Sequence, residues 1–218
     1  MNKRLFVIIF LLILIFYQNM LGKNITGLTS EEELLLKYKY EIINASEQLN
    51  ISSRIIASII YAEHKLNVKL GESILDYIFA KSGYNSSMGI AQIKINTAIW
   101  IEEQTHNPGS RFYLGSEIQN KIFISRNRGE IIDRLEDSEK NIFYASCYIA
   151  MIMKLWQPIL EIIESGSNKA GIIATIYSLG IIDENGKVRE PHINARMNNF
   201  GKVSQEFYHS FLLRDVFN

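Results

Sequence analysis

The stretch IIASIIYAEHKLN, residues 55–67, decides the fold class of this chain. Its four isoleucines recur at the three- and four-residue spacing of one helix face, and Ser52 stands in front of them as a cap. Glu63 follows Ile59 by four residues and Ile60 by three, so it continues the apolar stripe on the core side. The pattern predicts a helix that carries a carboxylate on its apolar face.

A carboxylate in this position is a candidate for acid–base chemistry. Ionised groups are seldom buried unless they are paired, and both loss of water and the negative end of the helix would raise the pKa of Glu63. A general acid needs a raised carboxyl pKa at neutral pH. The alternative is a Glu at a frayed helix end that turns into solvent or pairs with Lys65 or Lys69.

The composition favours one mainly helical domain. The chain has 218 residues, of which 47% are apolar, and only 3 Pro and 13 Gly interrupt it. There are 23 basic and 23 acidic residues and no basic stripe, so nothing supports a nucleic-acid partner. The single cysteine, Cys147, excludes an internal disulfide and a four-thiolate metal site.

The N-terminus has the pattern of an export segment. Lys3 and Arg4 precede an unbroken apolar run at residues 5–17, which has the length of a signal peptide. Residues 5–21 together approach the length of a membrane tether. We therefore expect residues 1–22 to be a signal peptide or a membrane anchor, and the protein to be exported to the periplasm or the cell surface.

The body behind this segment has helical patterns throughout. A capping box at Ser30 and Glu33 is expected to open a helix within residues 23–45 that leads into a single domain at residues 46–218. The other expected helices are 72–81, a short one around Trp100, 114–123, one from Asp137 or Ser138 to Trp156 that Pro158 breaks or restarts, 169–179, and 194–217.

Two later clusters could bind a ligand. In SSMGIAQ, Gly89 lets the backbone approach a ligand closely, and the amide of Gln92 can both donate and accept hydrogen bonds. In ATIYSLG, Tyr177 lies in an apolar helix end before Gly180, where it could reach a buried carboxylate. Taken singly, the first is also an ordinary helix start and the second an ordinary core Tyr beside a capping Gly.

The common cofactor signatures are missing from the sequence. It contains no phosphate-binding Gly-rich loop, no GxGxxG, no HExxH and no GxSxG. Its four histidines do not have metal-ligand spacing. We therefore assign no cofactor and no metal.

Four stretches, in their order along the chain, resemble the lysozyme-like lytic transglycosylases of the soluble lytic transglycosylase type. In that family a catalytic Glu ends a helix, a Gly-Leu-Met-Gln-like element follows, and an Ala-Tyr-Asn-x-Gly-like element comes later. The resemblance spans about residues 46–210 and implies a mainly α, lysozyme-like domain. The stretches are IIASIIYAEHKLN, SSMGIAQIKINTA, DSEKNIFYASCYIAMIMKLW and IIATIYSLG.

The resemblance assigns roles residue by residue. Glu63 matches the catalytic Glu, which would protonate the bond between N-acetylmuramic acid and N-acetylglucosamine and then, as a carboxylate, take the proton of the muramyl 6-hydroxyl. A 1,6-anhydro ring results, and no second carboxylate is needed to position water. Gly89 and Gln92 match the second element, while Tyr177 and Gly180 match the third.

Other positions follow from the same comparison. Asn141 begins the stretch that resembles the family's core helix. His64 stands where the family usually has Ser, and Ser178 stands where it usually has Asn. The implied substrate-binding set is Gly89, Gln92, Tyr177 and Ser178. Side chains that could stack on sugars, each of which could equally be core, are Trp100, Tyr84, Phe112, Tyr113 and Trp156.

Three kinds of protein fit these observations. The favoured one is a peptidoglycan lytic transglycosylase, whose partners would be glycan strands and a cell-envelope machine. A hydrolytic variant, a muramidase, would use Glu72 or Asp76 as a second carboxylate. The second kind is a non-catalytic glycan-binding or scaffold protein on the same fold. The third is a membrane-tethered helical interaction protein whose motif matches are accidental.

Overall fold

The structure of the protein is a computed structural model that describes residues 27–66, 81–162 and 168–217. It is mainly helical, as the sequence predicts. The prediction for residues 1–22 and, apart from Lys81, the prediction of a helix at 72–81 lie outside the described residues. None of the helices in the described ranges combines the length and the apolar character needed to cross a membrane.

The chain divides between Tyr38 and Lys39 into two compact units. The first contains α2 (Ser30–Lys37). Its capping box is formed by Thr29 and Glu32, because the Thr29 hydroxyl accepts from the Glu32 amide at 3.2 Å and the Glu32 carboxylate accepts from the Thr29 amide at 2.7 Å. The predicted box at Ser30 and Glu33 is therefore wrong by one residue.

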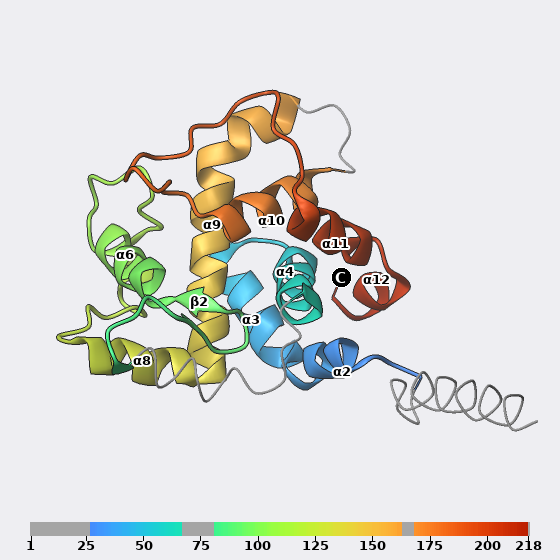
Figure 1. The fold of residues 1–218 in the computed structure, drawn as a ribbon, viewed down its shortest axis with the longest axis horizontal. Coiled ribbons are helices and arrows are strands. Elements are labelled where there is room, and N and C mark those ends of the chain that lie inside the picture. Colours follow the sequence, from blue (N-terminus) through green and yellow to red (C-terminus); the bar gives the residue numbers. More distant parts are fainter. Residues whose placement is uncertain (1–26, 67–80, 163–167, 218) are drawn as a thin grey trace, which may run out of the picture. The chain divides into compact units, whose positions relative to one another are not determined.

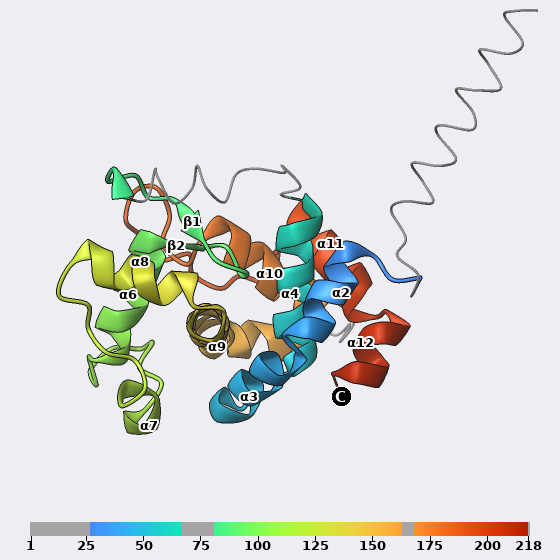
Figure 2. The same cartoon turned by 90° about the horizontal axis from the view of Figure 1, so that it is seen from below.

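The second unit is organised around its longest helix, α9 (Ser138–Ile162), which carries a nearly continuous run of buried residues. Figure 1 shows α9 running through the middle of this unit, and Figure 2 shows it nearly end-on. Because its apolar side chains surround it, neighbours can pack on several sides. The helices that contact it are α3 (Lys39–Leu49), α4 (Ser53–Leu66), α6 (Ile95–Thr105), α8 (Arg128–Glu136) and α10 (Lys169–Leu179).

Helix α9 continues through Pro158, so the expected break there is wrong. A proline removes one amide donor and leaves the carbonyl four residues earlier without its helical partner. Here that carbonyl belongs to Lys154, and both Lys154 and Pro158 are exposed, so water can solvate it. Buried Trp156 and Leu160 anchor the helix on either side of the proline.

The C-terminal segment forms two helices where one was expected over 194–217. Asn198 caps α11 (Asn199–Tyr208) by accepting from the Gly201 amide at 2.8 Å, and Ser210 caps α12 (Phe211–Val216) by accepting from the Leu213 amide at 3.2 Å. Because the Ser210 hydroxyl starts a new helix, the first one ends before it. Helix α11 packs against α10 and α4.

Two short strands join the helices on one side of α9. Strand β1 (Ser87–Met88) pairs antiparallel with β2 (Ile93–Lys94), with Met88 opposite Ile93. The turn between them contains the predicted Gly89 and Gln92. Helix α6 follows directly, and the small helix α7 (Ser116–Gln119) lies further along the chain.

Candidate active site

Most of the predicted site residues line one cleft of about 760 Å³ in the second unit. Glu63, Gln92, Tyr177 and Ser178 come from α4, the β1–β2 turn and α10, and all four face this space. Gly89, the fifth predicted residue, does not line the cleft. The further lining residues are Asn85, Ser87, Ile93, Lys94, Asn96, Thr97, Trp100, Tyr148, Leu179, Gly180, Ile182, Asp183, Glu184, Arg189 and Phe200.

Glu63 lies in the last turns of α4 and is 8% exposed. Ile59 and Ile60, on the same helix face, are fully buried. The alternative of a Glu that turns freely into solvent is therefore wrong. Its side chain lines the cleft from the apolar face of α4, where the helix periodicity places it.

The turn at residues 88–92, which we call the 88–92 segment, has an uncommon backbone. Gly89 and Gln92 both have positive φ, +71° and +49°. The Gln92 amide group donates to the Gly89 carbonyl at 2.8 Å, which closes the turn and leaves the Gln92 side-chain oxygen without a partner in the described residues. A Cβ at Gly89 would collide with the Asn141 side chain and with the Leu135 carbonyl. Glycine is required there both for its φ and for space.

Asn141, which is fully buried on α9, holds the 88–92 segment by hydrogen bonds. Its side-chain oxygen accepts from the Ala91 amide at 2.8 Å, and its amide donates to the carbonyls of Met88 at 2.8 Å and Leu135 at 3.0 Å. Each polar atom of the side chain is thus used. The conformation of this wall of the cleft depends on one residue about 50 positions further along the chain.

Tyr177 also holds the 88–92 segment. Its hydroxyl donates to the Ala91 carbonyl at 2.6 Å, so its proton is not given to Glu63 as the sequence interpretation expected. Burial, followed by the nearby charge of Glu63, raises the pKa of Tyr177 well above its usual range. Tyr177 therefore lies near the carboxylate but acts on the geometry of the segment beside it.

His64 makes the third connection. Its Nε2 lies 2.7 Å from the carbonyl oxygen of Ile90. The residue that follows Glu63 in α4 is therefore hydrogen-bonded to the 88–92 segment. His64 thus joins α4 to the 88–92 segment. Helices α4, α9 and α10 each contribute one side chain to this segment.

Ser178 is engaged with its surroundings. Its hydroxyl donates to the Thr175 carbonyl at 2.9 Å and accepts from the Asn198 side-chain amide at 2.9 Å. Asn198 is also the N-cap of α11. A side-chain amide, that of Asn198, therefore lies beside Ser178.

Of the aromatic residues proposed to stack on sugars, Trp100 lines the cleft. Its ring packs edge-on against Phe112 at 4.9 Å and against Tyr148 at 6.0 Å between centroids. Phe112 and Trp156 are buried, and Tyr84 and Tyr113 lie away from the cleft lining.

Sequence reasoning missed Tyr148 and Arg189. Tyr148 lies seven residues after Asn141, two helical turns along the same face of α9, so its position could have been found from helix geometry. Arg189 belongs to a loop whose path depends on tertiary contacts, and no sequence signal marks it. Glu72 and Asp76, the candidate second carboxylates, lie outside the described residues.

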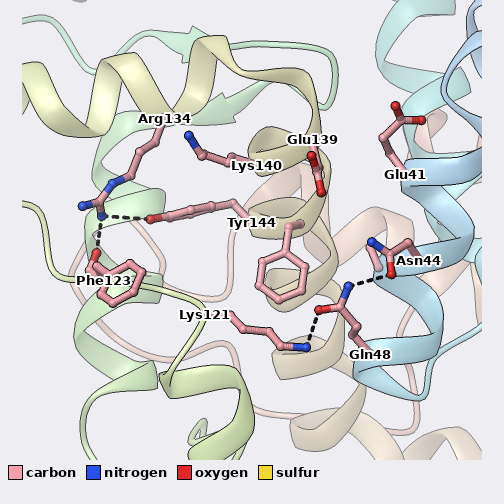
Figure 3. Close-up of a pocket in the computed structure, with 11 residues that line it drawn as sticks. Glu41, Asn44, Gln48, Lys121, Phe123, Arg134, Glu139, Lys140 and Tyr144 are labelled. Carbon is pink, nitrogen blue, oxygen red and sulfur yellow. Dashed lines mark hydrogen bonds between the residues drawn. The ribbon is translucent and has the colours of Figure 1, made fainter.

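A second cavity of about 330 Å³ lies between α3, α8 and α9 (Figure 3). Arg134 and Tyr144 line it and reach the buried carboxylate of Glu102, which accepts from them at 2.9 and 2.6 Å. Ser125 also donates to Glu102, through its amide and its hydroxyl. None of the predicted site residues lines this cavity, and its polar groups join α6, α8 and α9.

Comparison of the chain with protein-family models, with curated proteins and with solved structures finds no match. In the parts of the chain that the structure describes, no three His, Cys, Asp or Glu side chains gather as a metal site would require.

Proposed function

We propose that this protein is a peptidoglycan lytic transglycosylase with Glu63 as its single acid and base. The observation that supports this most is the burial of Glu63 at a cleft that it shares with Gln92 and Tyr177. A carboxyl group placed at the wall of a cleft can act as a general acid toward a glycosidic oxygen bound there.

The proposed reaction needs one carboxyl group in two states. Glu63 gives its proton to the glycosidic oxygen as the bond to the muramyl C1 breaks. The resulting carboxylate then takes the proton of the muramyl 6-hydroxyl, whose oxygen closes on C1. Glu63 regains its proton, atoms balance without water, and the product ends in a 1,6-anhydro ring.

The 88–92 segment would hold the sugar beside the acid. Gln92 offers a side-chain oxygen that has no partner in the described residues, and it can accept from a hydroxyl or an acetamide N–H. Trp100 offers an aromatic edge in the same cleft. His64, Asn141 and Tyr177 act as positioning residues, because they fix the backbone that carries Gln92.

The test is product analysis on purified wall sacculi. The full-length wild type should release muropeptides with anhydro ends, which differ from reducing ends by the mass of one water. Glu63→Gln keeps the shape and removes the proton, so turnover should fall by at least the roughly 10²- to 10⁴-fold typical of one acid–base role. Glu103→Gln, at an exposed position on α6, is the matched control and should retain activity.

Three results would contradict parts of this proposal. Residual activity of Glu63→Gln above about a tenth of wild type would remove Glu63 as the acid. Reducing ends as the main product would favour a muramidase, and Asp183 and Glu184 then become candidates for the second carboxylate because they line the cleft. A wild type that binds sacculi and releases nothing would be a glycan-binding protein on this fold.

A further inference from the structure

The chain after α10 forms a small hairpin at the edge of the cleft, residues 181–189. Ile182 and Val188 face each other in an isolated antiparallel bridge. The turn is closed by Asp183, whose carboxylate accepts from the amides of Asn185 at 2.9 Å and Lys187 at 2.8 Å. The 181–189 hairpin thus has a defined conformation.

Arg189 ends this hairpin and is fixed at its base. Its amide donates to the Ile181 carbonyl at 2.7 Å, and its Nε donates to the Gly180 carbonyl at 3.0 Å. The side chain is half-buried and lines the cleft. Its two terminal nitrogens have no partner among the described residues. A guanidinium held by its Nε presents these nitrogens in a fixed orientation.

Within the described residues, none of the neighbouring carboxylates forms an ion pair with Arg189. Glu190, the next residue, pairs with Arg111 at 2.7 Å. Asp183 is used within its own turn, and Glu184 is exposed. Positive charge in a partly buried wall without an ion-pair partner attracts an anionic ligand group.

Tyr148 lies beside Arg189 and adds a second donor. Its hydroxyl accepts from the Ile181 amide at 2.6 Å, while its own proton has no acceptor in the described part of the chain. The Tyr148 ring packs against that of Tyr177 at 5.7 Å between centroids, and Tyr177 in turn lies near Glu63. One wall of the cleft therefore carries, in this order, the carboxyl group of Glu63, the rings of Tyr177 and Tyr148, and the guanidinium of Arg189.

We propose that Arg189 and the Tyr148 hydroxyl form a subsite for a carboxylate carried by a muramyl residue of the bound glycan. The inference rests on the proposed function, because it names the part of that substrate that the cleft selects. A guanidinium binds a carboxylate through two parallel N–H donors, which gives orientation as well as affinity. The carboxylate is either that of the lactyl group on a bare strand or a free one of the stem peptide.

Binding to the full-length Glu63→Gln protein tests this without turnover. The probes are the muramyl disaccharide with a free lactyl carboxylate, the same disaccharide with its stem peptide, and both after methyl esterification. Esterification should weaken binding about tenfold or more for the probe whose carboxylate is recognised. Adding Arg189→Gln should abolish that difference, while Arg189→Lys should keep part of it.

Two controls separate recognition from structure. Lys187→Gln removes an exposed cation of the same hairpin that does not line the cleft, and it should leave the ester effect intact. A chitin oligosaccharide carries no carboxylate, so Arg189→Gln should leave its binding unchanged. If acids and esters bind equally, or if Arg189→Gln weakens both alike, the carboxylate subsite is refuted while glycan binding still stands. If no probe binds and the wild type releases nothing from sacculi, the proposed function itself fails.

Discussion

Replacing Asn141 should test how the wall of the cleft is held. Its side chain is fully buried and satisfies three backbone groups, namely the Ala91 amide and the carbonyls of Met88 and Leu135. Leu has nearly the shape of Asn but no polar atoms, so Asn141→Leu leaves the Ala91 amide and the Leu135 carbonyl buried without partners, while the Met88 carbonyl keeps its place in the ladder with Ile93. Ala leaves instead a space about the size of one water molecule.

The magnitudes follow from these contacts. A buried donor or acceptor left unpaired costs about 1–3 kcal/mol, so the two unpaired groups in Asn141→Leu should lower the free energy of unfolding by about 2–6 kcal/mol. That is a large part of the roughly 5–15 kcal/mol that stabilises a domain. In Asn141→Ala a water can enter and bond to about three polar groups, so the loss should be smaller, about 2–3 kcal/mol.

Urea unfolding followed by circular dichroism measures both variants. The matched control is Ser146→Ala on the same helix, which removes a buried hydroxyl that donates at 2.8 Å to the Ile142 carbonyl within its own helix. We expect it to cost about 1 kcal/mol or less. If Leu is tolerated better than Ala at position 141, or if Asn141→Leu costs no more than the control, the account of the two unpaired backbone groups is refuted.

The remaining predictions concern the cleft. Tyr177→Phe leaves the buried Ala91 carbonyl unpaired. The rate of muropeptide release should therefore fall by about one to two orders of magnitude. An unchanged rate would mean that Tyr177 is a core residue only. Ser178→Asn should leave this rate unchanged or raise it, because both side chains offer a donor and an acceptor to Asn198, and a loss of more than about tenfold would contradict this. Burial raises the pKa of Tyr148 to about 12, above the unfolded value of about 10, so stability should be complete below pH 10 and fall as the pH rises through 12. Its phenolate absorbance should then accompany the loss of helical circular dichroism, and ionisation of Tyr148 in the folded protein near pH 10 would refute this.

Helices with regular apolar spacing could be predicted closely from the sequence. Helix α10 has the bounds Lys169–Leu179 that were expected, and α9 begins at Ser138, within the predicted start at Asp137 or Ser138. In both helices the apolar residues recur at helical spacing over three or more turns, which is long enough to distinguish a helix from a strand or a loop. The strands β1 and β2 are two residues each, too short for any alternation to be read. Helix α8, which no expected element covers, has a narrower apolar stripe, with buried residues Ile131, Ile132 and Leu135.

The candidate site was predictable where helix geometry alone places a side chain. Glu63 is buried as its spacing from Ile59 and Ile60 requires. The roles of Asn141 and His64 toward the 88–92 segment depend on contacts between distant parts of the chain, which periodicity does not encode. Arg189 depends on the path of a hairpin that only its tertiary contacts determine.

The cleft should form late in folding, because the 88–92 segment is held by helices from distant parts of the chain. Its bonds come from His64, Asn141 and Tyr177, which are contributed by α4, α9 and α10. An intermediate that has docked only the first part of the chain lacks the last of these contacts. The Ala91 amide should therefore exchange its hydrogen only through global opening, and the complete cleft should appear in the same cooperative step as the native state.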